Sequence, residues 1–506
     1  MGDTALIIPG VNIMRKSGVL MHISSLPGNT GIGTMGGCAR EFVDFLYEAG
    51  QSYWQVLPVC PTSYGDSPYQ SFSCEAGNPY FIDLDELAAE GLLEKSEYES
   101  IDWESEPDSV NYGVMYEKRY KVLELAAARF LLNPDPDYES FLKENAGWLD
   151  DYAAFMALKH IYDGESWDRW EKNLRAREEK AMSAFLEENA DGITFWKVIQ
   201  FLFFKQWKAL KKYANARQVS IIGDLPIYVS YDSADVWAHP ELFQLDENEL
   251  PIEVAGCPPD GFSADGQLWG NPLYDWEHMA EDDYSWWIER IRYQCSIYDM
   301  LRIDHFRGFE SYYAIPYGDT TARCGRWRRG PGISLFQKAE KVLGRQNIIA
   351  ENLGFLTDAV HQMLDESGYP GMNVLEFAFD PRDDGGNLYL PHNYKDNVIA
   401  YVGTHDNDTA VGWYQDISDR DRAYAKTYMG LSEEEGISWG MMRNIWCSKA
   451  MITVVQAQDL LELGSEARMN TPSTLGENWK WRALPGSFSR ELAEKLRYRT
   501  GICGRR

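Results

Sequence analysis

The sequence predicts a (β/α)8 TIM barrel, and three observations lead to this prediction. Short apolar segments of strand length recur along the 506-residue chain, amphipathic stretches of helix length separate them, and several of the apolar segments end in carboxylates. Continuous apolar strands separated by helices are typical of parallel pairing in which both faces of the sheet are covered. Eight such units favour a closed barrel over an open sheet.

The expected strands are spread over nearly the whole chain. They are residues 18–27 including their loop, 53–59, 220–229, 300–306, 347–353, 372–379, 397–406 and 452–458. Helices are expected at 38–50, 357–367 and 440–450 between these strands, and at 487–499 near the end. Short apolar runs can also be fragments of helices, an alternative that the number of runs leaves open.

Two regions do not fit a minimal barrel, although we expect residues 1–506 to form a single catalytic unit. Residues of about 80–200 are acidic and favour helices, which predicts a helical insertion. Its expected helices are 116–132, 151–162, a solvated helix at 167–188, and 195–213, which leads the chain back to the barrel. Residues of about 230–276 are rich in Pro, Gly and Asp and follow the third strand. Barrel enzymes place active-site loops there, so we expect a loop insertion.

Composition and charge exclude several classes of partner. The net charge of −30 repels nucleic acid and anionic lipid, so neither is expected to bind. The sequence contains no apolar stretch long enough to span a bilayer, and its first residues lack the basic start and apolar core of a signal peptide. The eight cysteines are dispersed without a Cys-x-x-Cys pair, which fits a reducing cytosol and argues against a thiolate zinc site. We therefore expect a cytoplasmic protein, either monomer or homodimer.

Chemically versatile side chains stand at the ends of four expected strands. They are Asp224, Asp304, His305, Glu351, His405 and Asp406, and Arg302 precedes Asp304 by two residues. In a barrel the carboxyl ends of the strands meet at one mouth, so these side chains would converge there. Taken singly, each Asp can be a helix N-cap and each His a core residue. The combination is what points to a functional site.

Several carboxylates at one mouth suit the chemistry of acetals. One carboxylic acid must protonate the leaving oxygen, while another attacks the sugar or directs a water molecule; in retaining enzymes the two are about 5 Å apart. The acid needs a pKa raised by burial or by a neighbouring anion. The other carboxylate must stay ionised. Arg302 lies on the same strand face as Asp304, where its positive charge can keep the Asp304 carboxylate ionised.

Aromatic residues are the second clue. The chain has 18 Trp, 30 Tyr and 21 Phe, and Tyr64, Phe262 and Trp269 stand in turn-rich segments. Aromatic side chains usually pack in the core, but those flanked by Gly, Pro, Ser and Asp can also form platforms for sugar rings. The sequence leaves both interpretations open.

The motifs RIDHFRG (302–308), AENLG (350–354) and GTHDNDT (403–409) resemble the catalytic signatures of the amylomaltases, or disproportionating enzymes, which are 4-alpha-glucanotransferases related to the alpha-amylases. Four further segments match the same family: YGDSPYQ (64–70), GDLPIYV (223–229), PPDGFSADGQLWGNP (258–272) and RMNTPST (468–474). The resemblance runs from about residue 17 to the C-terminus. It implies the same barrel fold.

The resemblance also implies a reaction and three catalytic residues. The enzyme would move alpha-1,4-glucan segments from a donor to the 4-hydroxyl of glucose or a malto-oligosaccharide, with retention. Asp304 would be the nucleophile that forms the glucosyl ester, Glu351 the general acid/base, and Asp406 the stabiliser of the distorted sugar. Malto-oligosaccharides and glucans derived from starch or glycogen would be substrates, glucose would be an acceptor, and neither cofactor nor metal would be needed.

Further residues would bind the glucan, as the resemblance implies. Arg302 would orient Asp304. The sugar at the cleavage point would be bound by Asp224, His305 and His405, with Tyr64 stacked beneath it. A loop over the cleft would carry Asp260, Gln267 and Trp269, and Asn470 would lie on the acceptor side. The family often has Tyr or Ala where this chain has Gly261. Glycine removes a glucan contact and loosens the loop, so the acceptor preference is left open.

Three alternatives compete with this interpretation. A metal-dependent barrel enzyme could use His305, Glu351, His405 and Asp406 as ligands, although a His-Glu-x-x-His spacing is missing from the sequence. A glucan-binding protein with an inactive barrel would lack a carboxylate, yet all three are present. An alpha-glucan hydrolase shares the covalent intermediate and differs in whether water or a sugar resolves it, which depends on how the cleft excludes water.

Overall fold

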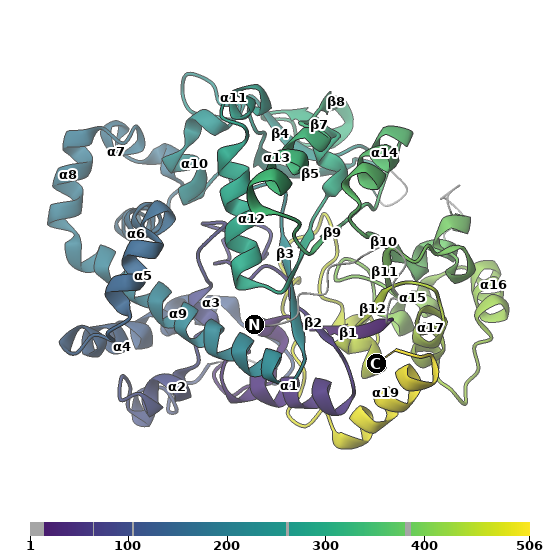
Figure 1. Ribbon diagram of the computed structural model, residues 1–506. Coiled ribbons are helices and arrows are strands. Elements are labelled where there is room, and N and C mark those ends of the chain that lie inside the picture. Colours follow the sequence, from purple (N-terminus) through teal and green to yellow (C-terminus); the bar gives the residue numbers. More distant parts are fainter. Residues whose placement is uncertain (1–14, 64, 104–105, 260–262, 380–385, 506) are drawn as a thin grey trace.

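The protein is described by a computed structural model that covers residues 15–63, 65–103, 106–259, 263–379 and 386–505 (Figure 1). Its centre is an eight-stranded parallel sheet. The strands are β1 (Lys16–Leu20), β2 (Tyr53–Gln55), β3 (Ser220–Leu225), β6 (Met300–Ile303), β9 (Ile348–Ala350), β10 (Gly371–Val374), β11 (Val398–Tyr401) and β12 (Ile452–Gln456). Each overlaps an expected strand but ends earlier than predicted, because the apolar pattern continues into the buried loops at the carboxyl ends.

The sheet closes on itself into a nearly complete barrel. Its strands follow the order β10-β11-β12-β1-β2-β3-β6-β9. The two end strands, β9 and β10, are neighbours: the amide of Ala350 donates to the carbonyl of Pro370 at 2.9 Å, and the amide of Met372 donates to Oδ1 of Asn352 at 2.7 Å. The predicted (β/α)8 class is confirmed.

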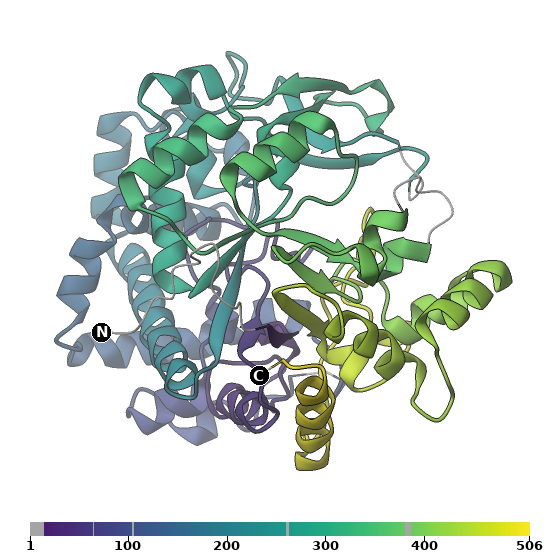
Figure 2. The same cartoon turned by 45° about the vertical axis from the view of Figure 1, so that its right-hand side comes forward.

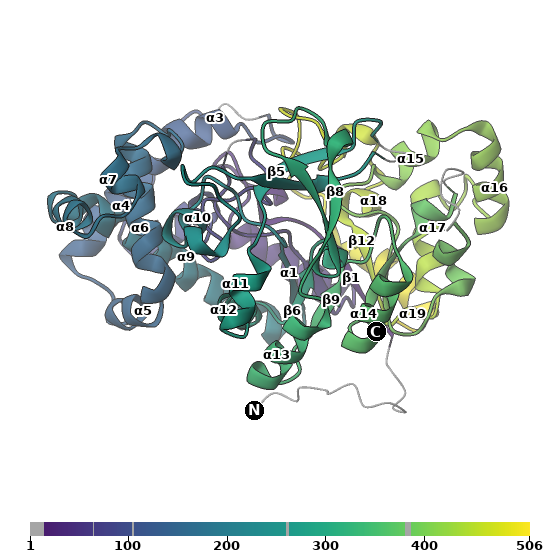
Figure 3. The ribbon, with the colours of Figure 1, turned by 90° about the horizontal axis from the view of Figure 1, so that it is seen from above.

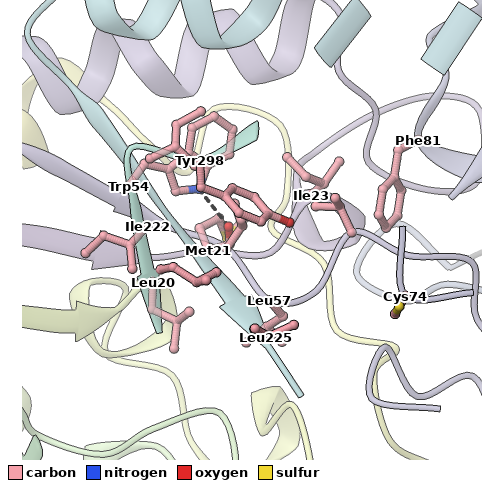
Figure 4. Packing of buried hydrophobic residues seen from close by; sticks show 14 of the residues in the cluster. Leu20, Met21, Ile23, Trp54, Leu57, Cys74, Phe81, Ile222, Leu225 and Tyr298 are labelled. Atoms are coloured by element: carbon pink, nitrogen blue, oxygen red, sulfur yellow. Dashed lines mark hydrogen bonds between the residues drawn. The ribbon is translucent and has the colours of Figure 1, made fainter. Parts of the chain in front are cut away.

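Large apolar side chains hold the barrel strands against their helices. Trp54 and Ile222 are fully buried, and the indole Nε1 of Trp54 donates to the carbonyl of Met21 at 2.7 Å (Figure 4). The ring of Tyr298 packs on the backbone of β3, where a Cβ added to Gly223 would lie 2.1 Å from it. Only glycine fits at that position. Burial of each such side chain contributes about 1.5–3 kcal/mol.

A group of helices extends from one side of the barrel, on the left in Figure 1. They are α2 (Leu84–Ala89), α3 (Tyr112–Val114), α4 (Tyr120–Leu132), α5 (Tyr138–Glu144), α6 (Ala146–Ile161), α7 (Lys172–Arg175), α8 (Glu179–Glu188) and α9 (Ala190–Ala216). The side-chain amide of Gln200, on α9, pairs with both backbone groups of Gly77, and Gln206 pairs likewise with Asp83. Helix α9 thereby fixes the segment that follows β2 at the barrel.

The prediction of one solvated helix at 167–188 is wrong. The segment forms a short 3-10 turn (Trp167–Arg169) and the separate helices α7 and α8. Arg177 has a φ of 51°, a left-handed conformation that interrupts the helix. Trp167 is buried, and its Nε1 donates to the carbonyl of Tyr231 at 2.7 Å. The side chain thus anchors the insertion to the loop after β3.

A four-stranded antiparallel sheet lies beside the barrel and was not expected. It consists of β4 (Glu253–Cys257), β5 (Gln267–Pro272), β7 (Ser311–Pro316) and β8 (Arg326–Arg329), in the order β5-β4-β7-β8. Figure 3 looks down on β5 and β8, which lie in front of the barrel strands. Segment 230–276, expected as a loop, therefore contains β4, β5 and the helix α10 (Ala234–Ala238). Its strands are short and rich in Gly and Pro, which hides the alternation typical of strands.

The remaining helices surround the rest of the barrel. They are α1 (Gly37–Glu48), α11 (Trp276–Glu281), α12 (Ser285–Ile297), α13 (Ile333–Leu343), α14 (Asp358–Ser367), α15 (Ala410–Asp416), α16 (Asp419–Met429), α17 (Ile437–Trp446), α18 (Ala457–Leu460) and α19 (Arg490–Ile502). The yellow helix α19 lies beside the purple α1 in Figure 2, and the ring of Phe488, just before α19, packs on Phe42 at 4.8 Å. The helices that the structure describes include none that is long and apolar enough to cross a membrane.

Candidate active site

Three charged side chains, from β3, from β6 and from the residue that follows β6, form a largely buried ion cluster at the mouth of the barrel. Asp224 and Arg302 are direct partners in the strand register. Nη1 of Arg302 donates to both carboxylate oxygens of Asp224, at 2.7 and 2.6 Å, and Nη2 donates to Oδ1 of Asp304 at 2.9 Å. The side chains of Arg302 and Asp224 are 4% and 0% exposed, whereas that of Asp304 is 26% exposed. One guanidinium therefore fixes two carboxylates, and only Asp304 is accessible.

Glu351 follows β9 directly and is held by the backbone. Its Oε2 accepts from the amide of His305 at 2.7 Å, and its Oε1 accepts from the amide of Leu353 at 2.5 Å. His305 has a φ of 49°, a left-handed conformation that costs energy outside glycine and marks a constrained site. Glu351 is buried. Asp304 directly precedes His305, whose amide donates to Glu351, so the turn at His305 brings the carboxyls of Asp304 and Glu351 close to one another.

The pKa values of these two carboxyls are both raised. Burial, together with the charges of Asp224, Glu351 and Asp406, outweighs Arg302 and raises the pKa of Asp304 to about 8. Burial and the charge of Asp406 raise the pKa of Glu351, although Arg302 and the two amide donors oppose this shift. Two interacting carboxyls of this kind share their protons, so the raised pKa values belong to the pair.

Asp406 stands on the opposite side of the mouth, in the loop after β11. Its Oδ1 accepts from Nδ2 of Asn470 at 2.7 Å, and its backbone carbonyl accepts from Nη2 of Arg468, also at 2.7 Å. The amide of Asn470 donates to the carbonyl of His405 at 3.1 Å. The side chain of Asp406 is 46% exposed. It is therefore the most accessible of the three carboxylates.

Two histidines border the mouth as neutral side chains. The ring of His405 stacks on Tyr69 with centroids 5.1 Å apart, and burial lowers its pKa. The ring of His305 meets the edge of Trp269 at 4.9 Å, and burial lowers its pKa to about 3. Nε1 of Trp269 in turn donates to Oε1 of Gln267 at 3.0 Å. These five residues line the rim around the carboxylates.

A small cavity lies beside the ion cluster. Tyr69 and Asp224 form part of its lining, together with Cys74 and Arg290, but Asp304 and Glu351 do not. Among the described residues, the ligand-type side chains close enough together to hold a cation are Cys74, Glu75 and Asp235. That group does not include the carboxylates or histidines at the mouth.

Comparison with known proteins decides the family. Residues 21–486 match the family model described as 4-alpha-glucanotransferase.

The chain belongs to the 4-alpha-glucanotransferase family.

Known members of the 4-alpha-glucanotransferase family match this chain over nearly their whole length. A 4-alpha-glucanotransferase from Clostridium butyricum is 48% identical, covering 96% of this chain and 100% of its own. One from Thermus thermophilus is 46% identical, covering 96% and 98%. The structure of an amylomaltase from Streptococcus agalactiae in complex with acarbose is 44% identical, covers 97% of this chain and 99% of its own, and superposes with a TM-score of 0.94. The predicted resemblance to the amylomaltases is confirmed.

The structure brings most of the predicted site residues of this 4-alpha-glucanotransferase family member to one mouth. Tyr64 and Asp260, with Gly261, lie outside the described residues, so their placement stays a prediction. Tyr69 was missed, although it lies in the same YGDSPYQ segment as Tyr64. Its hydroxyl donates to Oδ2 of Asp224 at 2.8 Å. The motif gave the signal, but the sequence does not tell that Tyr69 turns toward the barrel.

Arg468 and Glu376 were also missed. Arg468 is in the quoted RMNTPST segment, and its guanidinium donates to the backbone of both Asn470 and Asp406. Glu376 is buried directly behind the loop that carries Asp406. Arg468 reaches Asp406 across 62 positions of the chain, and Glu376 lies against Gly403, 27 positions away; local sequence patterns do not reveal such contacts.

Proposed function

We propose that the protein transfers alpha-1,4-glucan segments from a donor to the 4-hydroxyl of glucose or a malto-oligosaccharide, with retention through a covalent ester on Asp304. Its family membership supports the transfer reaction. The observation that carries the residue assignment is the 2.9 Å contact of Arg302 with Asp304, beside the buried Glu351. An exposed, ion-paired carboxylate next to a buried carboxyl is the arrangement that double displacement needs.

In the first half-reaction, an oxygen of Asp304 attacks the anomeric carbon of the donor. The bond from that carbon to the glycosidic oxygen breaks, and Glu351 gives its proton to this oxygen. Arg302 keeps its contact with Asp304 and favours the ionised form of the attacking carboxylate. The released chain leaves with the proton, and Glu351 is left ionised.

In the second half-reaction, the 4-hydroxyl of an acceptor attacks the same carbon. Glu351 takes the hydroxyl proton, the ester bond breaks, and Asp304 is regenerated as a carboxylate. The two half-reactions require one proton in the pair of carboxyls, and the raised pKa values of Asp304 and Glu351 support this count. In the free protein the proton can reside on either carboxyl, and the reactive form has it on Glu351.

The remaining residues are proposed to hold the sugar. Asp406, 46% exposed, would accept hydrogen bonds from ring hydroxyls, with Asn470 fixing its orientation. His405, Tyr69, Trp269 and Gln267 would form the walls around it. The side chain of Asp224 is fully buried, so we infer that it fixes Arg302, and a direct contact with the sugar would require Tyr69 to move.

We also propose a cytoplasmic location. The structure describes the cysteines as free thiols, which supports a reducing compartment.

The decisive experiment is incubation with maltotriose alone, with a chelator present, followed by separation of the products. Glucose together with maltopentaose and longer chains is the expected result. Glucose and maltose alone would replace the proposal with a hydrolase on the same scaffold. An unchanged substrate would overturn the proposed reaction, and activity that returns only with added divalent metal would favour a metal-dependent enzyme.

A further inference from the structure

Glu376 is a buried carboxyl that the proposed reaction does not use. It follows β10, and its amide donates to the carbonyl of Val402, at the end of β11, at 3.2 Å. The residue is 3% exposed. Its Oε1 has no hydrogen-bond partner among the described residues. A buried polar atom of this kind costs stability, so its retention calls for a functional explanation.

The carboxyl of Glu376 packs against the turn that leads to Asp406. A Cβ added to Gly403 would lie 2.8 Å from Oε1 of Glu376 and 2.9 Å from Cβ of Asn407. Oδ1 of Asn407 accepts from both the amide and the hydroxyl of Thr404, each at 3.0 Å. The side-chain amide of Asn407 lies near the Glu376 carboxyl and opposes the rise in its pKa. Asn407, which follows Asp406, therefore links Glu376 to Thr404, which precedes Asp406 in the turn.

The charges around Glu376 favour its neutral form. Burial raises its pKa well above the ordinary value, and the carboxylates of Asp459 and Asp408 raise it further. Arg468 and the hydrogen bond from Asn407 act in the opposite direction and are outweighed. A carboxyl in its neutral form both accepts and donates hydrogen bonds.

We propose that Glu376 is a positioning residue that packs against Gly403 and Asn407 and so fixes the turn that presents Asp406 to the sugar. The inference rests on the proposed function, because Asp406 matters only if a sugar is transferred at this mouth. A shift of about 1 Å in such a turn can lower turnover by as much as a hundredfold.

The test compares kcat and KM for maltotriose disproportionation in the wild type, E376A, E376Q and a control. E376A is expected to lower kcat about tenfold to a hundredfold, with KM little changed, because it displaces a group that acts in the transition state. E376Q has the shape of the neutral acid and is expected to stay within about threefold of wild type, since glutamine keeps both a donor and an acceptor. The matched control is E435A.

Glu435 is another poorly exposed carboxyl, 13% exposed in its side chain, which pairs with Arg443 and Arg499 away from the mouth. E435A is expected to lower the melting temperature and leave kcat unchanged. If E376A does the same, Glu376 is merely structural and the proposal is overturned. If E376Q is as impaired as E376A, the contact of a side chain of this shape with the turn is not what positions Asp406, and the proposal is again overturned.

A double-mutant cycle tests the route through Asn407. If Glu376 acts through Asn407, then E376A/N407A loses no more kcat than the worse single variant. Additive losses would overturn this route. Should E376A fail to fold, E376Q, N407A and the control decide the outcome. Failure of the proposed function is separate, because it would show as absent transfer in the wild type.

Discussion

The two sides of the barrel mouth hold their carboxylates by different means. On the β3–β6 side, Arg302 is 4% exposed and bonds to both Asp224 and Asp304. On the β11 side, Asp406 is 46% exposed and is held by the neutral amide of Asn470. The first side is a cluster of charges inside the protein, and the second is a hydrogen-bonded loop in contact with solvent.

This difference sets the expected size of each substitution's effect. Buried charges interact strongly and leave an uncompensated partner when one is removed, whereas an exposed hydrogen bond is worth little on its own. Substitutions on the β3–β6 side should therefore cost more than substitutions on the β11 side. The following predictions test this order.

Asp304→Asn should have the largest effect. Turnover of maltotriose should fall by at least about 10⁴-fold, because the group that forms the covalent ester is lost. The rate of product formation is the measurement, and Asp283→Asn, on the surface beside Lys338, is the control. A near-normal rate for Asp304→Asn would mean that another residue is the nucleophile.

Glu351→Gln should lower the same rate about 10³-fold, within the range of general acid–base catalysis. A donor with fluoride as the leaving group needs no proton in the first step, so the variant should still form the ester from maltosyl fluoride. Detection of that ester by mass spectrometry checks the assignment. Equal loss with maltotriose and maltosyl fluoride would contradict a role as the acid.

Arg302→Lys should lower kcat about 10²-fold although it keeps the charge. A lysine ammonium lacks the fork that reaches Asp224 and Asp304 together, so Asp304 loses its fixed orientation. The control is Arg326→Lys, because Arg326 also pairs with a buried carboxylate, Glu253, on the antiparallel sheet. Equal effects of the two substitutions on kcat would show that the cluster at the mouth has no special role.

Asn470→Ala should have a smaller effect, about a tenfold loss in kcat, because Asp406 keeps its backbone bond to Arg468 and remains in solvent. Asn478→Ala, whose side chain bonds only to its own loop, is the control. A loss as large as that of Arg302→Lys would remove the distinction between the two sides of the mouth.

The pH dependence sharpens the comparison further. Activity should fall as the pH rises through about 8, because the pair of Asp304 and Glu351 then loses its last proton.

The raised pKa of Asp304 also affects the stability of the fold. The folded carboxyl of Asp304 takes up protons more readily than the unfolded one, whose pKa is near 3.8, so stability should fall as pH rises from about 4 to 8. Asp304→Asn should then melt at a higher temperature than wild type at pH 8, and an equal or lower value would contradict the raised pKa.

The sequence predicts the barrel well because its signal is repeated and local. Each expected strand overlaps an observed one, as apolar runs such as that of β12 are buried on both faces. The prediction failed where a strand depends on contacts with residues far away in the sequence. The strands β4 and β5 were taken for a loop. Strand β5 pairs only with β4, and the other partner of β4, β7, lies beyond β6 in the sequence.

At the site, the residues at strand ends were found because topology alone gathers them at one mouth. The bond of Arg302 to Asp224, made across neighbouring strands, was not predicted, since it depends on the register of β3 and β6. The placement of Tyr69 beside Asp224 depends on the path of a loop, which the sequence does not give. Glu376 belongs to an apolar strand segment and carries no sign in the sequence that its carboxyl faces the turn before Asp406.

The junction of β9 and β10 has a consequence for the motion of the barrel. There the amide of Met372 bonds to the side chain of Asn352, the neighbour of Glu351, instead of to a main-chain carbonyl. A side chain can follow small displacements that a ladder of main-chain bonds resists. We therefore expect the circumference of the ring to be adjustable beside Glu351, the residue that must serve first as proton donor to a departing chain and then as proton acceptor from an arriving one.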